Sequence, residues 1–267
     1  MAAPAAARER HSSVTTELEH VRRTWQQLGS DDPLWAVLSS PEKRGGRWNV
    51  DDFFASGRDE IDNQMNIVLP PLGLPRQRRL AIDFGCGAGR LTRALGRHFA
   101  AVIGLDVSTS MVRTARGLNA DISNIAFREN TGARLDLIAD RSVDFLSCCI
   151  VLQHIPASLQ IGYVADFFRV LAPGGVAMFQ FVIGSDDSPR GRVYKRLSNR
   201  WMNVFRRIAW RRWNVFEMHP LSESAVVDLL AKDHGLRLVL AADDQSAGPG
   251  WRSRRWHVSR DASTSVL

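Results

Sequence analysis

The sequence predicts an α/β protein in which a Rossmann-like, seven-stranded and mostly parallel sheet is covered by helices on both faces. Three observations lead to this prediction. Short apolar runs alternate with helical stretches between residues 80 and 183. The apolar run at 143–152 is typical of a strand that is buried on both faces. A glycine-rich turn at 85–89 follows the first run, and another at 173–175 precedes the last. This alternation is typical of parallel strands joined by crossover helices.

The N-terminal part is expected to be helical. Residues 1–12 are predicted to form a disordered tail, and residues 13–75 a helical cap. A capping box can form between Thr16 and Glu19, and apolar residues follow it at helical spacing. A further helix is predicted over residues 50–69, where a pair of prolines ends it.

Residues 76–184 are expected to form the core of the fold. The predicted elements of this core, in chain order, are strands at 80–84, 101–105, 125–127, 143–152 and 176–183 and helices at 90–99, 108–118 and 158–171. A C-terminal segment, residues 221–267, is expected to complete the sheet with one helix and two strands. No internal repeat is visible in the sequence.

A basic insertion, residues 185–220, separates the core from that C-terminal segment. It holds nine basic residues and no acidic residue between Arg190 and Arg212, so the net charge of +7 is local. Apolar residues between 194 and 213 recur at intervals that predict an amphipathic helix. Three interpretations stay open: a lid with a solvated basic face, a lid whose arginines meet an anionic acceptor, and a helix that lies on a membrane surface.

Composition narrows the class of protein. The hydrophobic fraction of 45% is ordinary for a globular chain. No run reaches the roughly 18 to 20 apolar residues that span a bilayer, and the apolar N-terminus is too short for a signal peptide. We therefore expect a cytoplasmic protein, with peripheral membrane contact through residues 194–213 as an open alternative. The cysteines are odd in number, which argues against a disulfide framework: Cys86, Cys148 and Cys149.

The turn after the first predicted strand has the chemistry of a ligand-binding loop. Gly85, Gly87 and Gly89 alternate there, and Asp83 precedes them. Such a turn lets the backbone approach a ligand closely, and the next helix exposes N–H groups at its start. Asp106 ends the second predicted strand, where a carboxylate can accept both ribose hydroxyls. The glycine run alone could equally begin a nicotinamide- or flavin-binding unit. The two acids favour S-adenosylmethionine, although the ribose role of Asp106 does not by itself separate these classes.

Four segments, taken together, resemble the class I S-adenosylmethionine (SAM) dependent methyltransferases. They occur in the order of that family's motifs, at residues 80–90, 102–111, 142–156 and 170–175. The resemblance implies SAM as the cofactor. The cofactor-binding residues that it implies are Asp83, Gly85, Gly87 and Gly89 for the methionine end, Asp106 for the ribose, and Val107, Met111 and Asn130 for the adenine. The family often has Gly-Asp after the third strand; this chain has Asn130 and Gly132 nearby, so the adenine contact at Asn130 departs from the pattern.

Two histidines are candidates for a general base, which a neutral alcohol acceptor would need. His154 follows the fourth predicted strand, at the sheet edge where α/β folds bind ligands, although a structural role in that loop is the alternative. His219 is the second candidate. Asp186 and Asp187 could act as acids, bases or magnesium ligands, but two adjacent aspartates in a polar loop are more often simply solvated. We assign no metal-binding residue.

A second, weaker resemblance predicts the class of the methyl acceptor. Residues 25–38 and 46–57 are similar to a branch of the family that acts on glycans and secondary metabolites. This favours O-methylation of a sugar hydroxyl or of another small molecule. The alternatives are a lipid-linked or nucleic-acid substrate, and a non-catalytic SAM-binding or regulatory protein. Nucleic acid is less expected, because a basic stretch alone is not an RNA-binding motif.

Overall fold

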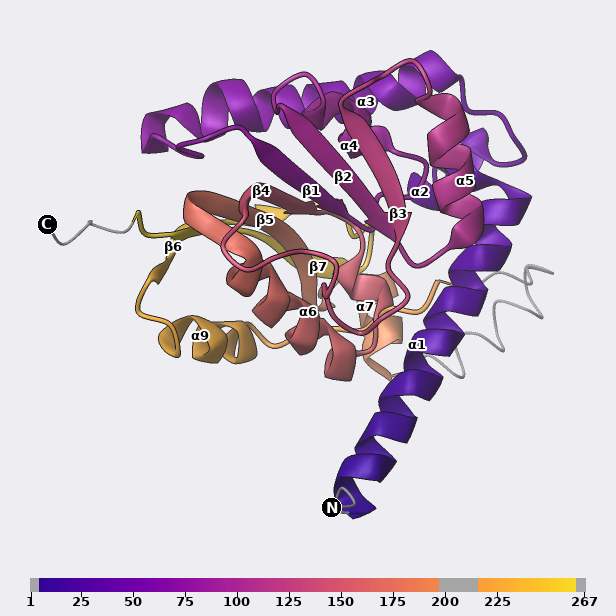
Figure 1. The fold of residues 1–267 in the computed structure, drawn as a ribbon. Helices are drawn as coiled ribbons and strands as arrows, with labels where there is room; N and C mark the ends of the chain where they lie inside the picture. Colours follow the sequence, from indigo (N-terminus) through magenta and orange to yellow (C-terminus); the bar gives the residue numbers. More distant parts are fainter. Residues whose placement is uncertain (1–4, 197–215, 263–267) are drawn as a thin grey trace, which may run out of the picture.

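The computed structural model describes residues 5–196 and 216–262, with side chains from residue 14 onward (Figure 1). Its centre is a seven-stranded sheet in the order β3-β2-β1-β4-β5-β7-β6. The strands, in chain order, are β1 (Leu80–Phe84), β2 (Ala101–Asp106), β3 (Ile125–Glu129), β4 (Val143–Cys148), β5 (Leu171–Ser185), β6 (Leu236–Asp244) and β7 (Trp251–Arg260). Strand β7 alone runs antiparallel to its neighbours, β5 and β6. The predicted seven-stranded, mostly parallel sheet is therefore confirmed.

Helices cover both faces of this sheet, because alternate residues of each buried strand point to opposite sides. The helices of the core and C-terminal segment are α4 (Arg90–Leu95), α5 (Thr109–Leu118), α6 (Ala157–Val170) and α9 (Glu223–Ala231). Ile82 packs in the cluster beneath α6, while its neighbour Ala81 packs in the cluster beneath α4. Figure 1 shows α4 on one face of the sheet and α6 and α9 on the other.

The N-terminal region is helical, as predicted, but it begins earlier. Its helices are α1 (Ala5–Asp31), α2 (Pro33–Val37) and α3 (Val50–Asn63), with 3₁₀ turns at Pro41–Lys43 and Pro70–Leu72 and a π turn at Gln64–Val68. Helix α1 thus extends into residues 5–12, which were expected to be disordered. The reason is local, since alanine, arginine and glutamate there favour helix. Thr16 consequently lies inside α1 rather than at a helix start.

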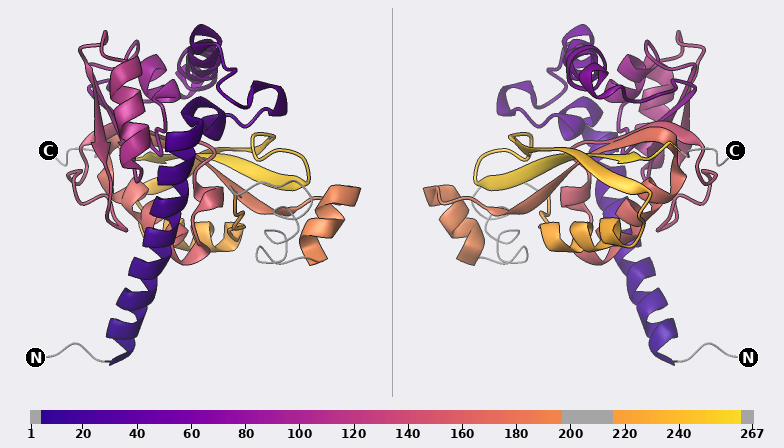
Figure 2. Two further views of the ribbon diagram at one scale, coloured as in Figure 1. Left: turned by 90° about the vertical axis from the view of Figure 1, so that its right-hand side faces the viewer. Right: turned by 90° about the vertical axis from the view of Figure 1, so that its left-hand side faces the viewer.

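Helix α1 is long and crosses the side of the molecule, and its N-terminal end projects beyond the body (Figures 1 and 2). Its C-terminal half is tied to the start of α5 by hydrogen bonds. Ser108 Oγ donates to the carbonyl of Trp25 at 3.2 Å, and Ser110 Oγ donates to the carbonyl of Gln26 at 2.9 Å. These bonds place α1 over the carboxyl edge of the sheet.

The basic insertion starts with α7 (Pro189–Arg196), which rests on the end of the sheet. The ring of Tyr194 stacks on that of Trp251 in β7, with centroids 4.9 Å apart. The rest of the predicted amphipathic helix, residues 197–213, lies outside the described residues, so membrane contact through it stays a prediction. Among residues 5–196 and 216–262, we find no helix with the length and hydropathy needed to cross a membrane.

Candidate cofactor and active site

The glycine-rich turn after β1 has backbone angles and surroundings that exclude side chains. Gly85, Gly87 and Gly89 adopt φ values of 74°, 51° and 87°. A Cβ atom on Gly85 would lie 2.3 Å from Val151, and one on Gly87 would lie 2.4 Å from Val37. Only glycine accommodates both the angles and the contacts. The turn therefore brings bare backbone to the carboxyl edge of the sheet.

Asp83 stands at the base of this turn, buried to 2% exposure. One carboxylate oxygen accepts a hydrogen bond from Thr92 Oγ1 at 2.7 Å, and the other accepts one from Ser147 Oγ at 2.8 Å. Burial raises the pKa of Asp83, although these two hydroxyl groups act in the opposite direction. The hydroxyls hold the carboxylate in one orientation and join β1 to α4 and β4.

Asp106 ends β2 and contacts the same turn. Its carboxylate accepts the backbone N–H groups of Gly87 and Ser108, both at 2.9 Å. Burial raises the pKa of Asp106 to about 6, against the lowering effect of these N–H groups. The carboxylate thus lies directly beside the glycine turn.

A cavity of about 920 Å³, its open mouth included, lies beside the turn. Seven of the eight predicted cofactor residues line it: Asp83, Gly85, Gly87, Asp106, Val107, Met111 and Asn130. Gly89 does not; it is the N-cap of α4 and lies behind the turn, against Asn119 and Phe127. Helices α1 and α2 form part of the wall, so the N-terminal cap closes over the turn.

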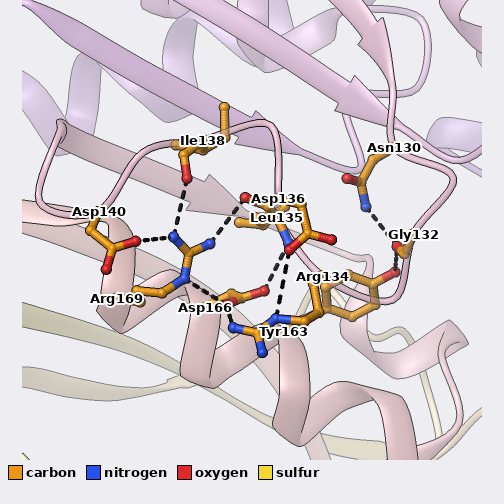
Figure 3. Close-up of polar contacts among 10 residues, drawn as sticks. All are labelled: Asn130, Gly132, Arg134, Leu135, Asp136, Ile138, Asp140, Tyr163, Asp166 and Arg169. Atoms are coloured by element: carbon orange, nitrogen blue, oxygen red, sulfur yellow. Dashed lines mark hydrogen bonds and ion pairs between the residues drawn. The ribbon is translucent and has the colours of Figure 1, made fainter.

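Asn130 also lines this cavity and is 4% exposed. Its backbone N–H donates to the carbonyl of Asp106 at 2.8 Å, and its side-chain amide donates to the carbonyl of Gly132 at 3.1 Å. Tyr163 on α6 donates to the same carbonyl at 2.9 Å (Figure 3). Sequence reasoning missed Tyr163, because nothing near it in the chain marks it as a wall residue.

The loop that carries Asn130 is anchored to α6 by ion pairs (Figure 3). Asp166 accepts the backbone N–H of Leu135 at 2.8 Å and also pairs with Arg134 and Arg169, at 2.9 and 2.8 Å. Arg169 in turn donates to the carbonyl of Leu135 at 3.0 Å. This network fixes the β3–β4 loop and with it the position of Asn130.

His154, the first candidate base, lies beside the cofactor cavity rather than in its wall. Its ring packs between Trp25 and Phe216, with centroids 5.3 and 5.6 Å away. The Nδ1–H group donates to the carbonyl of Glu217 at 2.9 Å, and Nε2 lies 3.2 Å from the side-chain amide of Gln153. Burial lowers the pKa of His154 to about 4, so the ring is neutral at physiological pH. It lines a second cavity of about 280 Å³ that shares Trp25 with the first.

His219, the second candidate, lines neither cavity. Its Nε2 lies 3.4 Å from a carboxylate oxygen of Glu217, and its backbone N–H donates to the carbonyl of Gln153 at 2.8 Å. The structure therefore gathers both histidines around Glu217, away from the glycine turn. General-base catalysis by either one stays a prediction.

Asp186 and Asp187 precede α7, and their side chains bond to residues at its start and along it. Asp186 accepts the backbone N–H of Ser188 at 3.0 Å, and Asp187 pairs with Lys195 at 2.7 Å. Within the part of the chain that the structure describes, no group of three or more His, Cys, Asp or Glu side chains is arranged to hold a metal ion.

Ile150, in the loop after β4, lines the cofactor cavity with an unusual backbone angle. Its φ is 61°, in the left-handed region that β-branched residues rarely occupy. Such a conformation costs about 1–3 kcal/mol and persists only where its surroundings hold it. No sequence signal pointed to Ile150, since isoleucine is the least expected residue for this angle.

Comparisons with known proteins agree with this geometry. A family model described as a methyltransferase domain matches residues 81–175. The chain is 32% identical over 110 residues to a ubiquinone biosynthesis O-methyltransferase of Paracidovorax citrulli, an alignment that covers 40% of this chain and 45% of that protein. It is 37% identical over 95 residues to a demethylmenaquinone methyltransferase of Tropheryma whipplei, covering 35% of this chain and 38% of that protein. The chain thus spans less than half the length of either relative.

The fold is also similar to a crystal structure of magnesium protoporphyrin IX methyltransferase from Synechocystis with bound SAH. The TM-score is 0.60 at 19% sequence identity, and the match covers 91% of this chain and 99% of that one. At this level of identity the likeness concerns the fold alone.

Proposed function

Since this chain belongs to the class I SAM-dependent methyltransferases through its residues 81–175, we propose that it transfers the methyl group of SAM to a hydroxyl oxygen of a small molecule. The printed activity of the Paracidovorax relative, an O-methyltransferase, supports oxygen as the acceptor atom. The observation that carries the proposal is the shared cavity, in which seven predicted cofactor residues and the apolar cap meet.

The residues fit the cofactor. Gly85 and Gly87 leave bare backbone where side chains would fill the cradle. Asp106 would accept the ribose hydroxyls, and Val107 and Met111 would flank the adenine, with Asn130 beside it. Bound there, SAM supplies an electrophilic sulfonium methyl group. The chain's own part is to orient the acceptor against that group and to exclude water, which are large contributions in a displacement reaction.

The wall supplied by the cap and the post-β4 loop is apolar. A sugar, which the sequence favoured as acceptor, needs polar partners for its several hydroxyls. The described wall instead offers mainly hydrocarbon and an indole ring beyond the glycine turn, from Leu18, Val21, Trp25, Ile150, Val151 and Ile155. We therefore infer a small acceptor with an apolar, flat body rather than a glycan.

The ionisable groups of the cavity wall favour an acceptor whose hydroxyl group is acidic. Both carboxylates, Asp83 and Asp106, already accept two hydrogen bonds each. Among the described residues no histidine lines the cavity, and residues 197–215 contain no Asp, Glu or His. A phenol, with a pKa near that of tyrosine at about 10, ionises far more readily than an alcohol. A phenolic or enolic hydroxyl therefore suits this site best.

Transfer of label from SAM to matched acceptors tests this function. We expect a phenol with an apolar substituent to be methylated at least about 100-fold faster than the cyclohexanol that carries the same substituent, because only the phenol ionises without a strong base. Monosaccharides should be poorer still. Equal rates for the phenol and the cyclohexanol would contradict the acidic acceptor. Transfer to no acceptor, with SAM binding intact, would favour a non-catalytic SAM-binding protein.

His154 stays the first candidate for the proton acceptor, and in that role its Nε2 would exchange the Gln153 amide for the acceptor hydroxyl. A neutral imidazole whose pKa is about 4 is a weak base, which suits an acidic hydroxyl and not an alcohol. We expect His154→Ala to lower kcat by about tenfold and to leave the Kd for SAM nearly unchanged. His219→Ala, the comparison variant, should lower kcat less, because that ring lies outside both cavities. Normal turnover in His154→Ala would remove the assignment.

A further inference from the structure

A chain of four hydrogen bonds runs from the cofactor cavity to Glu217, near the C-terminal end of the basic insertion. The backbone N–H of Ile150 donates to Gln180 Oε1 at 3.1 Å, and Gln180 Nε2 donates to Gln153 Oε1 at 3.0 Å. Gln153 Nε2 donates to His154 Nε2 across 3.2 Å, and His154 Nδ1–H donates to the carbonyl of Glu217 at 2.9 Å. Every donor points the same way, so each bond polarises the next.

The two glutamines of this relay are among the most deeply buried polar residues. Gln180, in the middle of β5, is 0% exposed, and Gln153 is 2% exposed. A buried amide is tolerated only when its oxygen and nitrogen are both hydrogen-bonded. Gln180 meets this condition by joining two points of the same loop, Ile150 and Gln153. An apolar residue would fill the position without that requirement, so the amide serves the loop rather than the core.

The near end of the relay holds the strained residue. Ile150 sits in the cavity wall at a φ of 61°, and Gln180 Oε1 accepts its backbone N–H. The next residue, Val151, packs directly over Gly85 of the cofactor turn. If Ile150 relaxed to a negative φ, Ile150 and Val151 would move relative to the glycine turn. We propose that Gln180 is a positioning residue, which sets the acceptor-facing wall against the cofactor turn by holding Ile150 in its left-handed conformation.

This role rests on the proposed function, because its effect on turnover is defined only for methyl transfer. Gln180 touches neither the turn nor any predicted cofactor residue through a hydrogen bond among the described residues. The expected consequence of its loss is therefore a poorly aligned acceptor with SAM still bound. Misplacement by about 1 Å can cost about 100-fold in rate.

The first test replaces Gln180 with methionine, which has a similar length and no hydrogen-bonding amide. We expect Gln180→Met to lower kcat by about tenfold or more and to change the Kd for SAM by less than about threefold. The matched control is Met178→Leu, two residues earlier on the same face of β5, which alters core packing without touching the relay. Met178→Leu should leave kcat unchanged below its melting temperature. An equal loss of kcat in both variants would overturn the proposal.

The second test asks whether Gln180 acts through Ile150. Glycine adopts positive φ without strain. In Ile150→Gly, the residue at position 150 therefore no longer needs the hydrogen bond to Gln180 to keep its left-handed conformation. In that background Gln180→Met should cost less than about threefold in kcat, compared with about tenfold in the native background. The same factor in both backgrounds would mean that Gln180 acts independently of Ile150, which contradicts the proposal.

A third measurement needs no acceptor. The Ile150 amide is expected to exchange with solvent at least about tenfold faster in Gln180→Met than in the native protein or in Met178→Leu. Unchanged protection of the Ile150 amide in Gln180→Met would contradict the proposal that Gln180 holds Ile150. It would leave the proposed function unaffected. Loss of protection in Gln180→Met, together with no methyl transfer by the native protein to any acceptor, would instead overturn the proposed function and leave the hold on Ile150 standing.

Discussion

Asp106→Ala is expected to weaken SAM binding by at least about 100-fold, the largest single effect on ligand affinity in this protein. Hydrogen bonds to a charged group contribute about 1.5–3 kcal/mol each, and one carboxylate can accept both ribose hydroxyls. The substitution also removes the acceptor of the Gly87 N–H, so the cofactor turn loses one of its hydrogen bonds to β2. Asp106→Asn keeps one oxygen acceptor and should lose only about tenfold. Calorimetric titration with SAM measures both values.

The same carboxylate predicts how SAM affinity depends on pH. Burial raises the pKa of Asp106 to about 6, and Asp83 acts in the same direction. A ribose that donates to the ionised form binds best above that pH, so the affinity should fall as the pH drops from 6 to 5. The fall should be absent in Asp106→Ala, because the titrating group is gone.

The control for Asp106 is Glu129→Ala. Glu129 ends the neighbouring strand β3, and its side chain does not line the cavity. It should retain native SAM affinity and native pH dependence. If Asp106→Ala binds SAM with an affinity within threefold of the native value, other residues hold the ribose. The assignment of the cofactor-binding residues in the cavity would then be wrong.

How far the sequence predicted this site depends on whether each feature is local. The glycine turn was predictable because Gly85 and Gly87 need positive φ and close contact whatever the rest of the chain does. Asp106 was predictable because a strand end at the next position along a parallel sheet reaches the same edge. These rules depend on a few neighbouring residues and on the order of the strands.

The surroundings of His154 were not predictable in this way. The chain order places it at the carboxyl edge of the sheet, but its ring bonds to Glu217, 63 residues later. Its edge-to-face partner Trp25 comes from α1, which packs over the sheet from the other end of the chain. No local pattern encodes such pairings, so the side of the loop that the ring faces follows only from the folded structure.

Gln180 shows the same limit inside a strand. An isolated polar residue in the apolar stretch of β5 is visible in the sequence, yet its partners in the post-β4 loop are not. The strained angle of Ile150 has no residue signature, because isoleucine is disfavoured there. Features of this kind depend on surrounding structure overriding local preference, which a pattern of residues does not record.

Glu60→Gln is expected to destabilise the protein by about 3 kcal/mol, because it leaves buried positive charge without its partner. Glu60, on α3, accepts Arg90 Nη2 at 2.7 Å and Arg255 Nη2 at 3.0 Å. The side chains of Arg90 and Arg255 are 6% and 14% exposed, and Asp244 pairs only with the latter, at 2.8 Å. Removing the Glu60 charge therefore strands Arg90 beside the cofactor cavity.

The pH dependence separates this charge effect from a packing effect. Burial alone would raise the pKa of Glu60, but Arg90 and Arg255 outweigh it and lower the pKa below its ordinary value of 4.5. A carboxyl whose folded-state pKa is lowered contributes stability above its unfolded pKa and loses it as the pH falls through the folded value. The difference between Glu60→Gln and the native protein, measured by urea unfolding, should thus shrink below pH 4.5. A constant difference would point to packing.

Two further variants test whether the stability lost in Glu60→Gln comes from the unpaired charge of Arg90. Asp121→Asn breaks an ion pair between Arg93 and Asp121 in which the Asp121 side chain is 61% exposed, so it should leave the stability nearly unchanged. A double variant, Glu60→Met with Arg90→Met, removes both charges of the pair and leaves Arg255 with Asp244. It should recover much of the stability lost in Glu60→Gln, because burying apolar side chains costs less than burying one unpaired charge. If the double variant is instead less stable than Glu60→Gln, Arg90 stabilises the fold through contacts other than the one with Glu60. The burial of Arg90 would then be explained by its position in the wall of the cofactor cavity.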